Sequence, residues 1–184
     1  MAIDNDGRER GELTGYTDAC WGDPDSTDPR STTGYVFKLA GGPISWASRR
    51  QRTTATSSTE AEYIAQCSTV KEAAYLRQFL NELGTVQKTA TLVNADNRGA
   101  IALAKGNSSQ TRSRHINFLY HYTREKVEDG TVDISYLLTQ DMAADGLTKA
   151  LEAANHRKFV TLLGMKDKGT VDGNGAGARA QAQV

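Results

Sequence analysis

The chain has 184 residues, enough for one domain and a tail, and its 22 basic and 22 acidic side chains cancel, so the net charge says nothing about a nucleic-acid partner. Its two cysteines, Cys20 and Cys67, have the spacing of neither a disulfide framework nor a zinc site, which fits a reducing, intracellular setting. Because no apolar run has the length of a membrane span or the character of a signal peptide, we expect neither.

The first regular element is a strand that ends on an acid. Residues 13–19 alternate in the period of a strand, and residues 22–29 consist of turn-forming types. Asp18 is therefore expected at or near the carboxyl end of this strand, where ligands collect in open α/β sheets. Aspartate is disfavoured in strands, so a metal ion or a hydrogen-bond network is expected to compensate, although a solvated strand end remains the simpler alternative.

Two further strands and a long helix follow. Residues 32–40 and 44–48 are predicted to be strands that complete an antiparallel meander. The helix is predicted over residues 59–83, because two Ser/Thr-x-x-Glu capping patterns precede it and Gly84 follows it. Its apolar stripe extends backwards at the same spacing to Glu62, which places that acid on the sheet-facing side, whereas Glu60 points elsewhere as the cap partner. The stripe consists of Glu62, Gln66, Thr69, Ala73, Leu76, Leu80 and Leu83.

The second half of the chain alternates between helices and strands. The predicted elements are a strand at 89–95 that ends at Asp96, helices at 98–105 and 112–127, a strand at 131–137 and a helical region at about 142–163 with breaks near Gly146 and 153–155. The third helix is expected to bury one face, made by Ile116, Leu119, Tyr120, Thr123 and Val127. The order β-β-β-α-β-α-α-β-α predicts an α/β fold with a mixed five-stranded sheet, strands one to three antiparallel, and helices packed on it. We expect a polar linker at 1–12, one domain at 13–164 and a disordered tail at 165–184.

Four acids end or begin these elements: Asp18, Glu62, Asp96 and Asp145. Ionised acids gathered at one sheet edge repel one another by about 1 kcal/mol per pair at 4 Å in water, and several-fold more in a drier site. Divalent cations bound between them would remove this repulsion, and hard oxygen ligands suit Mg²⁺ or Mn²⁺. Two such ions can activate water and stabilise the leaving oxygen in phosphodiester cleavage. Each acid could equally be a helix cap or a surface charge, and spacing alone does not decide.

Nine short motifs occur in order between residues 13 and 164. They are Thr14-Gly-Tyr-Thr-Asp18, residues 30–37, 44–46, 57–65, 96–97, 100–105, 114–116 and 124–127, and Ala144-Asp-Gly-Leu-Thr-Lys149. Together they resemble the ribonuclease H domain of copia-type LTR retrotransposon Pol polyproteins.

The resemblance implies the ribonuclease H-like fold, with helices on both faces of the sheet, and metal-dependent hydrolysis of the RNA strand of RNA–DNA hybrids during reverse transcription. By motif match, Asp18, Glu62, Asp96 and Asp145 are the catalytic acids and the ligands of two Mg²⁺ or Mn²⁺ ions. The implied partners are the hybrid and the reverse transcriptase portion of a Pol polyprotein. No membrane partner is expected. A monomeric domain is expected, in a cytoplasmic virus-like particle or the nucleus.

Some positions depart from the family pattern. Cys20 replaces an acid, residues 95–99 differ from the usual motif, and Gly146 replaces a larger apolar residue, which should loosen that helix by up to about 1 kcal/mol. No matched carboxylate is lost, yet these changes keep open the alternative of a degenerate copy that only binds nucleic acid or is structural. A small-molecule α/β enzyme is disfavoured, because the chain lacks a Gly-rich phosphate loop and a Ser/His/Asp arrangement. His115 lies in a helix-start motif and is expected to be structural.

Contacts to a hybrid duplex are expected from basic and polar residues near the acids, because a hybrid is recognised by its shape, backbone and 2′-hydroxyls. For any one of these residues a solvated surface position is an equal alternative. The candidates are Arg49, Arg50, Arg52, Ser57, Asn97, Lys105, Arg112 and Arg114.

Overall fold

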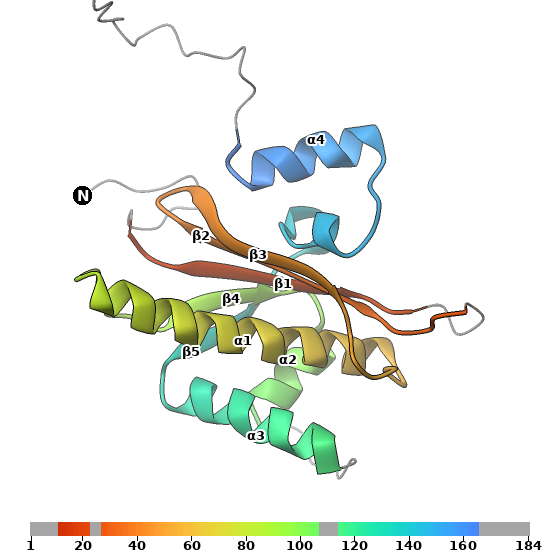
Figure 1. The fold of residues 1–184 in the computed structure, drawn as a ribbon, viewed down its shortest axis with the longest axis horizontal. Helices are drawn as coiled ribbons and strands as arrows, with labels where there is room; N and C mark the ends of the chain where they lie inside the picture. Colours follow the sequence, from red (N-terminus) through yellow and green to blue (C-terminus); the bar gives the residue numbers. More distant parts are fainter. Residues whose placement is uncertain (1–10, 23–26, 107–113, 166–184) are drawn as a thin grey trace, which may run out of the picture.

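The computed structural model describes residues 11–22, 27–106 and 114–165, with the backbone alone for 114–120 (Figure 1). It contains β1 (Thr14–Cys20), β2 (Thr32–Leu39), β3 (Gly42–Arg50), α1 (Ser58–Glu82), β4 (Thr91–Ala95), α2 (Arg98–Ala104), α3 (Arg114–Glu128), β5 (Val132–Tyr136), the single-turn 3₁₀ helices η1 (Thr139–Asp141) and η2 (Asp145–Leu147), and α4 (Ala153–Leu162).

The five strands form one mixed sheet in the order β3-β2-β1-β4-β5. Strands β1, β2 and β3 are antiparallel neighbours, whereas β4 pairs in parallel with β1, and β5 pairs in parallel with β4. The predicted meander and the predicted mixed sheet are therefore confirmed. Because β1, β4 and β5 run in the same direction, their carboxyl ends meet at one edge, towards the right of Figure 1.

Both faces of the sheet are covered, as the resemblance implied. Helices α1, α2 and α3 lie on one side, and η2 and α4 lie on the other (Figure 1). Successive strand residues point to opposite faces, so Phe37 belongs to the larger cluster under α1, while its neighbour Val36 packs with Tyr16 and Met142 in the smaller cluster. Both Val36 and Phe37 are fully buried.

The start of α1 follows the predicted capping pattern. The side chain of Ser57, the N-cap residue, accepts a hydrogen bond from the backbone N–H of Glu60 at 3.2 Å. The carboxylate of Glu60 accepts hydrogen bonds from the backbone N–H and the hydroxyl of Thr56. Glu60 thus serves the cap, as predicted, and is not directed at the sheet edge.

The sheet-facing side of α1 is buried from Glu62 to Leu80, as its stripe predicts. Thr69 connects this side to the central strand, because its hydroxyl lies 2.9 Å from that of Thr17. The prediction was wrong for Leu83, which is 64% exposed and lies at the C-cap, where Gly84 with φ 78° turns the chain away from the helix.

The predicted helical region at 142–163 required correction. The structure contains η2, then a non-helical segment at 148–152, then α4, so Asp145 lies in a single 3₁₀ turn. The hydroxyl of Thr148 lies 3.0 Å from the carbonyl oxygen of Asp145, and such a side-chain contact competes with a continuing helix. Gly146 does not merely loosen this segment, because a Cβ there would lie 2.6 Å from the ring of Phe159.

Most of the predicted linker and tail lie outside the described residues, so the division into linker, domain and tail stays a prediction. In α3, Thr123 is fully buried and Val127 packs against the core, while the side chains of Ile116, Leu119 and Tyr120 lie outside the described part.

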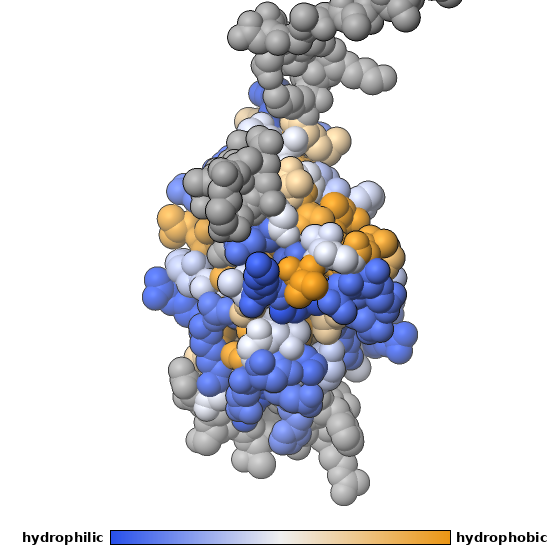
Figure 2. All heavy atoms as spheres, turned by 90° about the vertical axis from the view of Figure 1, so that its left-hand side faces the viewer, coloured by the Kyte–Doolittle hydropathy of each residue, from blue (hydrophilic) through white to orange (hydrophobic). Residues whose placement is uncertain are grey.

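Within the described residues, none of the helices combines the length and the apolar character that crossing a membrane requires. At the end of the molecule opposite to the carboxyl ends of β1 and β4, Figure 2 shows apolar residues in separate patches among polar ones.

Replacing a buried leucine and the exposed leucine of α1 should have clearly different effects. Leu80→Ala is expected to lower the free energy of unfolding by about 2–4 kcal/mol, because Leu80 is 6% exposed and the change leaves a cavity. Leu83→Ala should change it by less than about 0.5 kcal/mol. Urea unfolding of both variants measures the difference, and equal losses would contradict the described end of α1.

Candidate metal centre

Three predicted acids meet at the carboxyl edge of the parallel strands. Asp18 lies near the end of β1, Asp96 directly follows β4, and Glu62 comes from the start of α1. One carboxylate oxygen of each lies within 4.8 Å of those of the other two. Segments far apart in sequence therefore bring three carboxyl groups to one place.

Glu62 occupies the least favourable position for a charge. Its side chain is 7% exposed, and it receives one hydrogen bond from the backbone of Ala19. Its Oε2 atom is buried and has no hydrogen-bond partner among the described residues. Burial, followed by the charges of Asp18 and Asp96, raises the pKa of Glu62 to about 9.

Asp18 and Asp96 are each positioned by a threonine hydroxyl. The hydroxyl of Thr148 donates to Oδ2 of Asp18 at 2.5 Å, and that of Thr139 donates to Oδ2 of Asp96 at 2.7 Å. Burial raises the pKa of Asp18, the hydrogen bond from Thr148 lowers it, and the nearby Asp96 raises it again, with a net upward shift. The two hydroxyls fix the direction of both carboxylates towards the cluster.

The fourth predicted acid, Asp145, lies beside this cluster but outside the group of three. Its carboxylate forms an ion pair with Lys149 at 2.5 Å, and this pairing raises the pKa of Lys149. The charge of Asp145 raises the pKa of both Asp18 and Glu62, which places it within electrostatic reach of them. Its role as a metal ligand stays a prediction.

The residues at this edge fit a divalent cation of the hard type. The donors are carboxylate oxygens, which suit Mg²⁺ or Mn²⁺, and one of them, Oε2 of Glu62, is buried without a partner. A bound cation would reverse the upward pKa shifts, because it favours the charged form of each carboxylate. Cys20 is exposed and its thiol lies 3.8 Å from the carbonyl oxygen of Trp21, so it does not join the group of three acids.

Three of the predicted nucleic-acid contacts line a groove whose walls include none of the four acids. Arg49, Arg50 and Arg52 line a groove of about 710 Å³ between the end of β3 and α1, together with Lys71 and Ser68 of α1. Arg50 also supports the neighbouring loop, because its guanidinium donates to the carbonyl oxygen of Arg30 at 2.5 Å.

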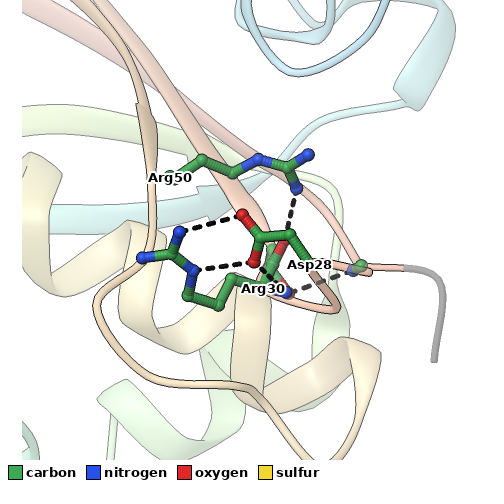
Figure 3. Close-up of polar contacts among 5 residues, drawn as sticks. Asp28, Arg30 and Arg50 are labelled. Carbon is green, nitrogen blue, oxygen red and sulfur yellow. Dashed lines mark hydrogen bonds and ion pairs between the residues drawn. The ribbon is translucent and has the colours of Figure 1, made fainter. Parts of the chain in front are cut away.

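Figure 3 shows how the segment with Asp28 and Arg30, just before β2, is held. Arg30 binds both carboxylate oxygens of Asp28, at 2.7 and 2.8 Å, while Arg50 reaches the backbone of Arg30 from β3 (Figure 3). The bidentate pairing with Arg30 lowers the pKa of Asp28 to about 2. The guanidinium of Arg50 is therefore partly committed to loop structure.

The remaining predicted nucleic-acid contacts have varied surroundings. Ser57 and Asn97 are the N-cap residues of α1 and α2, and Lys105 forms an ion pair with Asp133 at 3.0 Å. Arg112 and the side chain of Arg114 lie outside the described residues. Nucleic-acid binding by all eight residues stays a prediction.

Sequence reasoning missed two residues that position the acids. Thr148 lies within the recognised motif at 144–149 and could have been noticed, whereas nothing local marks Thr139 as the partner of Asp96. Gln66 follows Glu62 by one helical turn and is fully buried, and neither of its amide atoms has a hydrogen-bond partner among the described residues.

Several curated relatives are Pol polyproteins of plant transposons. The retrovirus-related Pol polyprotein from transposon TNT 1-94 of Nicotiana tabacum is 42% identical over 154 residues, which make up 83% of this chain and 11% of that protein. The corresponding polyprotein from transposon RE1 of Arabidopsis thaliana is 36% identical over 154 residues, 83% of this chain and 10% of that protein. The chain thus spans about a tenth of the length of these relatives. No family model matches the chain.

Solved structures with the same fold are ribonucleases H. The N-terminal ribonuclease H domain of rv2228c from Mycobacterium tuberculosis has a TM-score of 0.55 and 12% identity, and the match covers 85% of this chain and 98% of that one. LC11-RNase H1, isolated from compost and solved in complex with an RNA/DNA hybrid, has a TM-score of 0.54 and 15% identity, over 74% and 93% of the two chains. These matches show the ribonuclease H-like fold.

The raised pKa of Glu62 gives the metal-free protein a specific pH dependence. In the folded state Glu62 keeps its proton until a pKa of about 9, against an ordinary value of 4.5, so the folded form binds more protons between these limits. Its contribution to the free energy of unfolding therefore falls as pH rises from about 4.5 towards 9.

Glu62→Gln should remove this dependence. In EDTA the variant should equal the wild type near pH 5 and exceed its stability near pH 8 by on the order of a few kcal/mol. Thermal and urea unfolding across this pH range measure the difference, and parallel pH profiles of the two proteins would rule out a buried, protonated Glu62.

Proposed function

Because the chain belongs to the ribonuclease H-like domains of retrovirus-related Pol polyproteins, we propose that it is a metal-dependent endonuclease that hydrolyses the RNA strand of RNA–DNA hybrids during reverse transcription. The observation that carries the proposal is the cluster of Asp18, Glu62 and Asp96 with its unpartnered, buried carboxylate oxygen. The hybrid bound to one of the structural neighbours supports the choice of substrate.

Asp18, Glu62 and Asp96 would hold the cations, two by analogy with sites of this kind, and Asp145 would complete the set. When bound, such ions activate a water molecule and stabilise the leaving oxygen of the phosphodiester. The protein's own part is to hold the carboxylates in place. Thr148 and Thr139 fix two of them, and the backbone of Ala19 fixes the third.

Lys149 has a separate part at this edge. Its ammonium group neutralises Asp145 at 2.5 Å, and its charge also lowers the pKa of Asp18. Lys149 pairs with only one carboxylate oxygen of Asp145, so the other oxygen would remain available to a cation while the ammonium group would face the phosphate backbone of the substrate. The pair thus offers one charge to the metal and the opposite charge to the substrate.

A second candidate function is a degenerate domain that binds hybrids without cleaving them. Cys20, two residues after Asp18, favours it, because the thiol replaces an acid of the family pattern. A further departure, Gly146, has a packing reason, since the ring of Phe159 occupies the space of a Cβ. The nuclease is therefore the better supported of the two.

The partners follow from the relatives. We assign the chain to a monomeric domain that works with the reverse transcriptase portion of a Pol polyprotein, inside the cell, in a virus-like particle or the nucleus. The basic groove of Arg49, Arg50 and Arg52 would contact the sugar–phosphate backbone of the hybrid.

Two glutamates of the same helix provide a matched test of the nuclease. Glu62→Gln and Asp18→Asn should each reduce Mg²⁺-dependent cleavage of an RNA–DNA hybrid by roughly a hundredfold or more, because each removes a charge from the cluster. Glu60→Gln should keep activity near that of the wild type and lower stability by about 1 kcal/mol, since Glu60 serves only the cap.

Gel analysis of a labelled RNA strand measures cleavage, and circular dichroism checks that each variant folds. Unchanged cleavage by folded Asp18→Asn protein would reject the assignment of the site. Absence of cleavage by the wild type in Mg²⁺ and in Mn²⁺, with hybrid binding intact, would select the degenerate domain.

A further inference from the structure

An arginine and a tyrosine stack beside the acid cluster on the side of α2. Arg98 is the first residue of α2, two positions after Asp96, and Tyr136 is the last residue of β5. The register pairs Ala95 with Tyr136, so both residues lie at the same carboxyl edge as the acids. The guanidinium carbon of Arg98 lies 4.2 Å from the centroid of the Tyr136 ring, which is the geometry of a cation–π contact.

The charge of Arg98 is not neutralised by an acid. Lys149 pairs with Asp145, and Lys105 pairs with Asp133. Within the described part of the chain, no ion pair or hydrogen bond is found for the guanidinium of Arg98, although Asp96 is two residues away. The carboxylate of Asp96 is instead fixed by Thr139, so Arg98 keeps its full charge and its N–H donors for a ligand.

The stack leaves this guanidinium open to the solvent. Arg98 is exposed, and Tyr136 is 41% exposed. A planar guanidinium held flat on a ring presents its N–H groups sideways as a fork, which matches two oxygens of a phosphate group. The ring thus limits the freedom of a long side chain without using its donors, as a preformed anion site requires.

We infer that Arg98, held on Tyr136, binds a backbone phosphate of the RNA–DNA hybrid next to the carboxylates. The inference rests on the proposed function, which supplies the hybrid as the ligand. A polyanion that approaches the acids is repelled by them, and a fixed positive charge beside Asp96 offsets this repulsion. Arg98 is a positioning residue in this role, because it holds the strand and touches none of the reacting atoms.

The test is the affinity of the full chain for a short fluorescein-labelled RNA–DNA hybrid, measured by anisotropy in Ca²⁺ at several salt concentrations. Arg98→Ala should weaken binding by about five- to tenfold near 0.1 M salt and reduce the salt slope by about one, as expected for one lost phosphate contact. Arg98→Lys keeps the positive charge but loses the forked N–H donors of the guanidinium, so its affinity should lie between those of the wild type and Arg98→Ala. Tyr136→Phe keeps the ring and should bind like the wild type, whereas Tyr136→Leu should weaken binding about two- to threefold.

Lys88 provides the control, because it is an exposed cation just before β4, at the strand end opposite to Asp96. Lys88→Ala should bind the hybrid like the wild type. In cleavage assays Arg98→Ala should raise KM by the same factor as the dissociation constant and leave kcat within about twofold, as expected when a contact acts equally in the ground and transition states.

The outcomes separate this inference from the proposed function. Equal affinities of wild type and Arg98→Ala, or equal losses in Arg98→Ala and Lys88→Ala, would overturn the inference even if the wild type cleaves the hybrid. Binding that depends on Arg98 without any cleavage would uphold it and reject the nuclease. A wild type that does not bind the hybrid would overturn both.

Discussion

The structure depends on holding three carboxylates together at one sheet edge, where Asp18 and Glu62 are buried. Burial and the neighbouring charges both oppose the ionisation of Glu62 and Asp18, which is why the pKa of Glu62 rises to about 9 and that of Asp18 rises as well. These unfavourable carboxyl groups lie at the edge where β1 and β4 end side by side and α1 begins. Such an arrangement weakens the metal-free protein and would become favourable if cations shared the oxygens.

The surrounding packing serves this arrangement. Gly34 of β2 pairs with Asp18 of β1, and a Cβ at Gly34 would lie 2.7 Å from Cγ2 of Thr148. The absence of a side chain on β2 therefore lets Thr148 approach from the other face and hydrogen-bond Asp18. Phe159 closes over Gly146 in the same way, so two glycines allow the segment with Asp145 to pack against the sheet.

The sequence predicted the elements well where the signal was local. Alternation and β-forming composition located all five strands to within about two residues, and the Ser57 capping pattern located the start of α1. The helical stripe assigned Glu62 to the sheet and left Glu60 to the cap. Leu83 was misassigned, because the turn at Gly84 removes it from the stripe.

Contacts between distant segments could not be read from the sequence. The bond from Thr139 to Asp96 and the stack of Arg98 on Tyr136 both depend on the parallel pairing of β4 with β5, which no local pattern records. The 3₁₀ turn around Asp145 depends on Thr148, whose hydroxyl hydrogen-bonds both the Asp145 carbonyl and Asp18 of β1. This contact with a distant strand cannot be predicted from the local helix propensity of the segment. The family motif located the four acids in the sequence, and the fold was needed to show that three of them meet.

The most direct measurement is anomalous diffraction from crystals of the full chain soaked in Mn²⁺ near pH 8. If the cluster binds hard divalent cations, a manganese peak will lie within coordination distance of carboxylate oxygens of Asp18, Glu62 and Asp96, and it will be absent from crystals of the Glu62→Gln variant. Ordered crystals saturated with Mn²⁺ that show no peak among these three carboxylates would contradict the proposed metal centre.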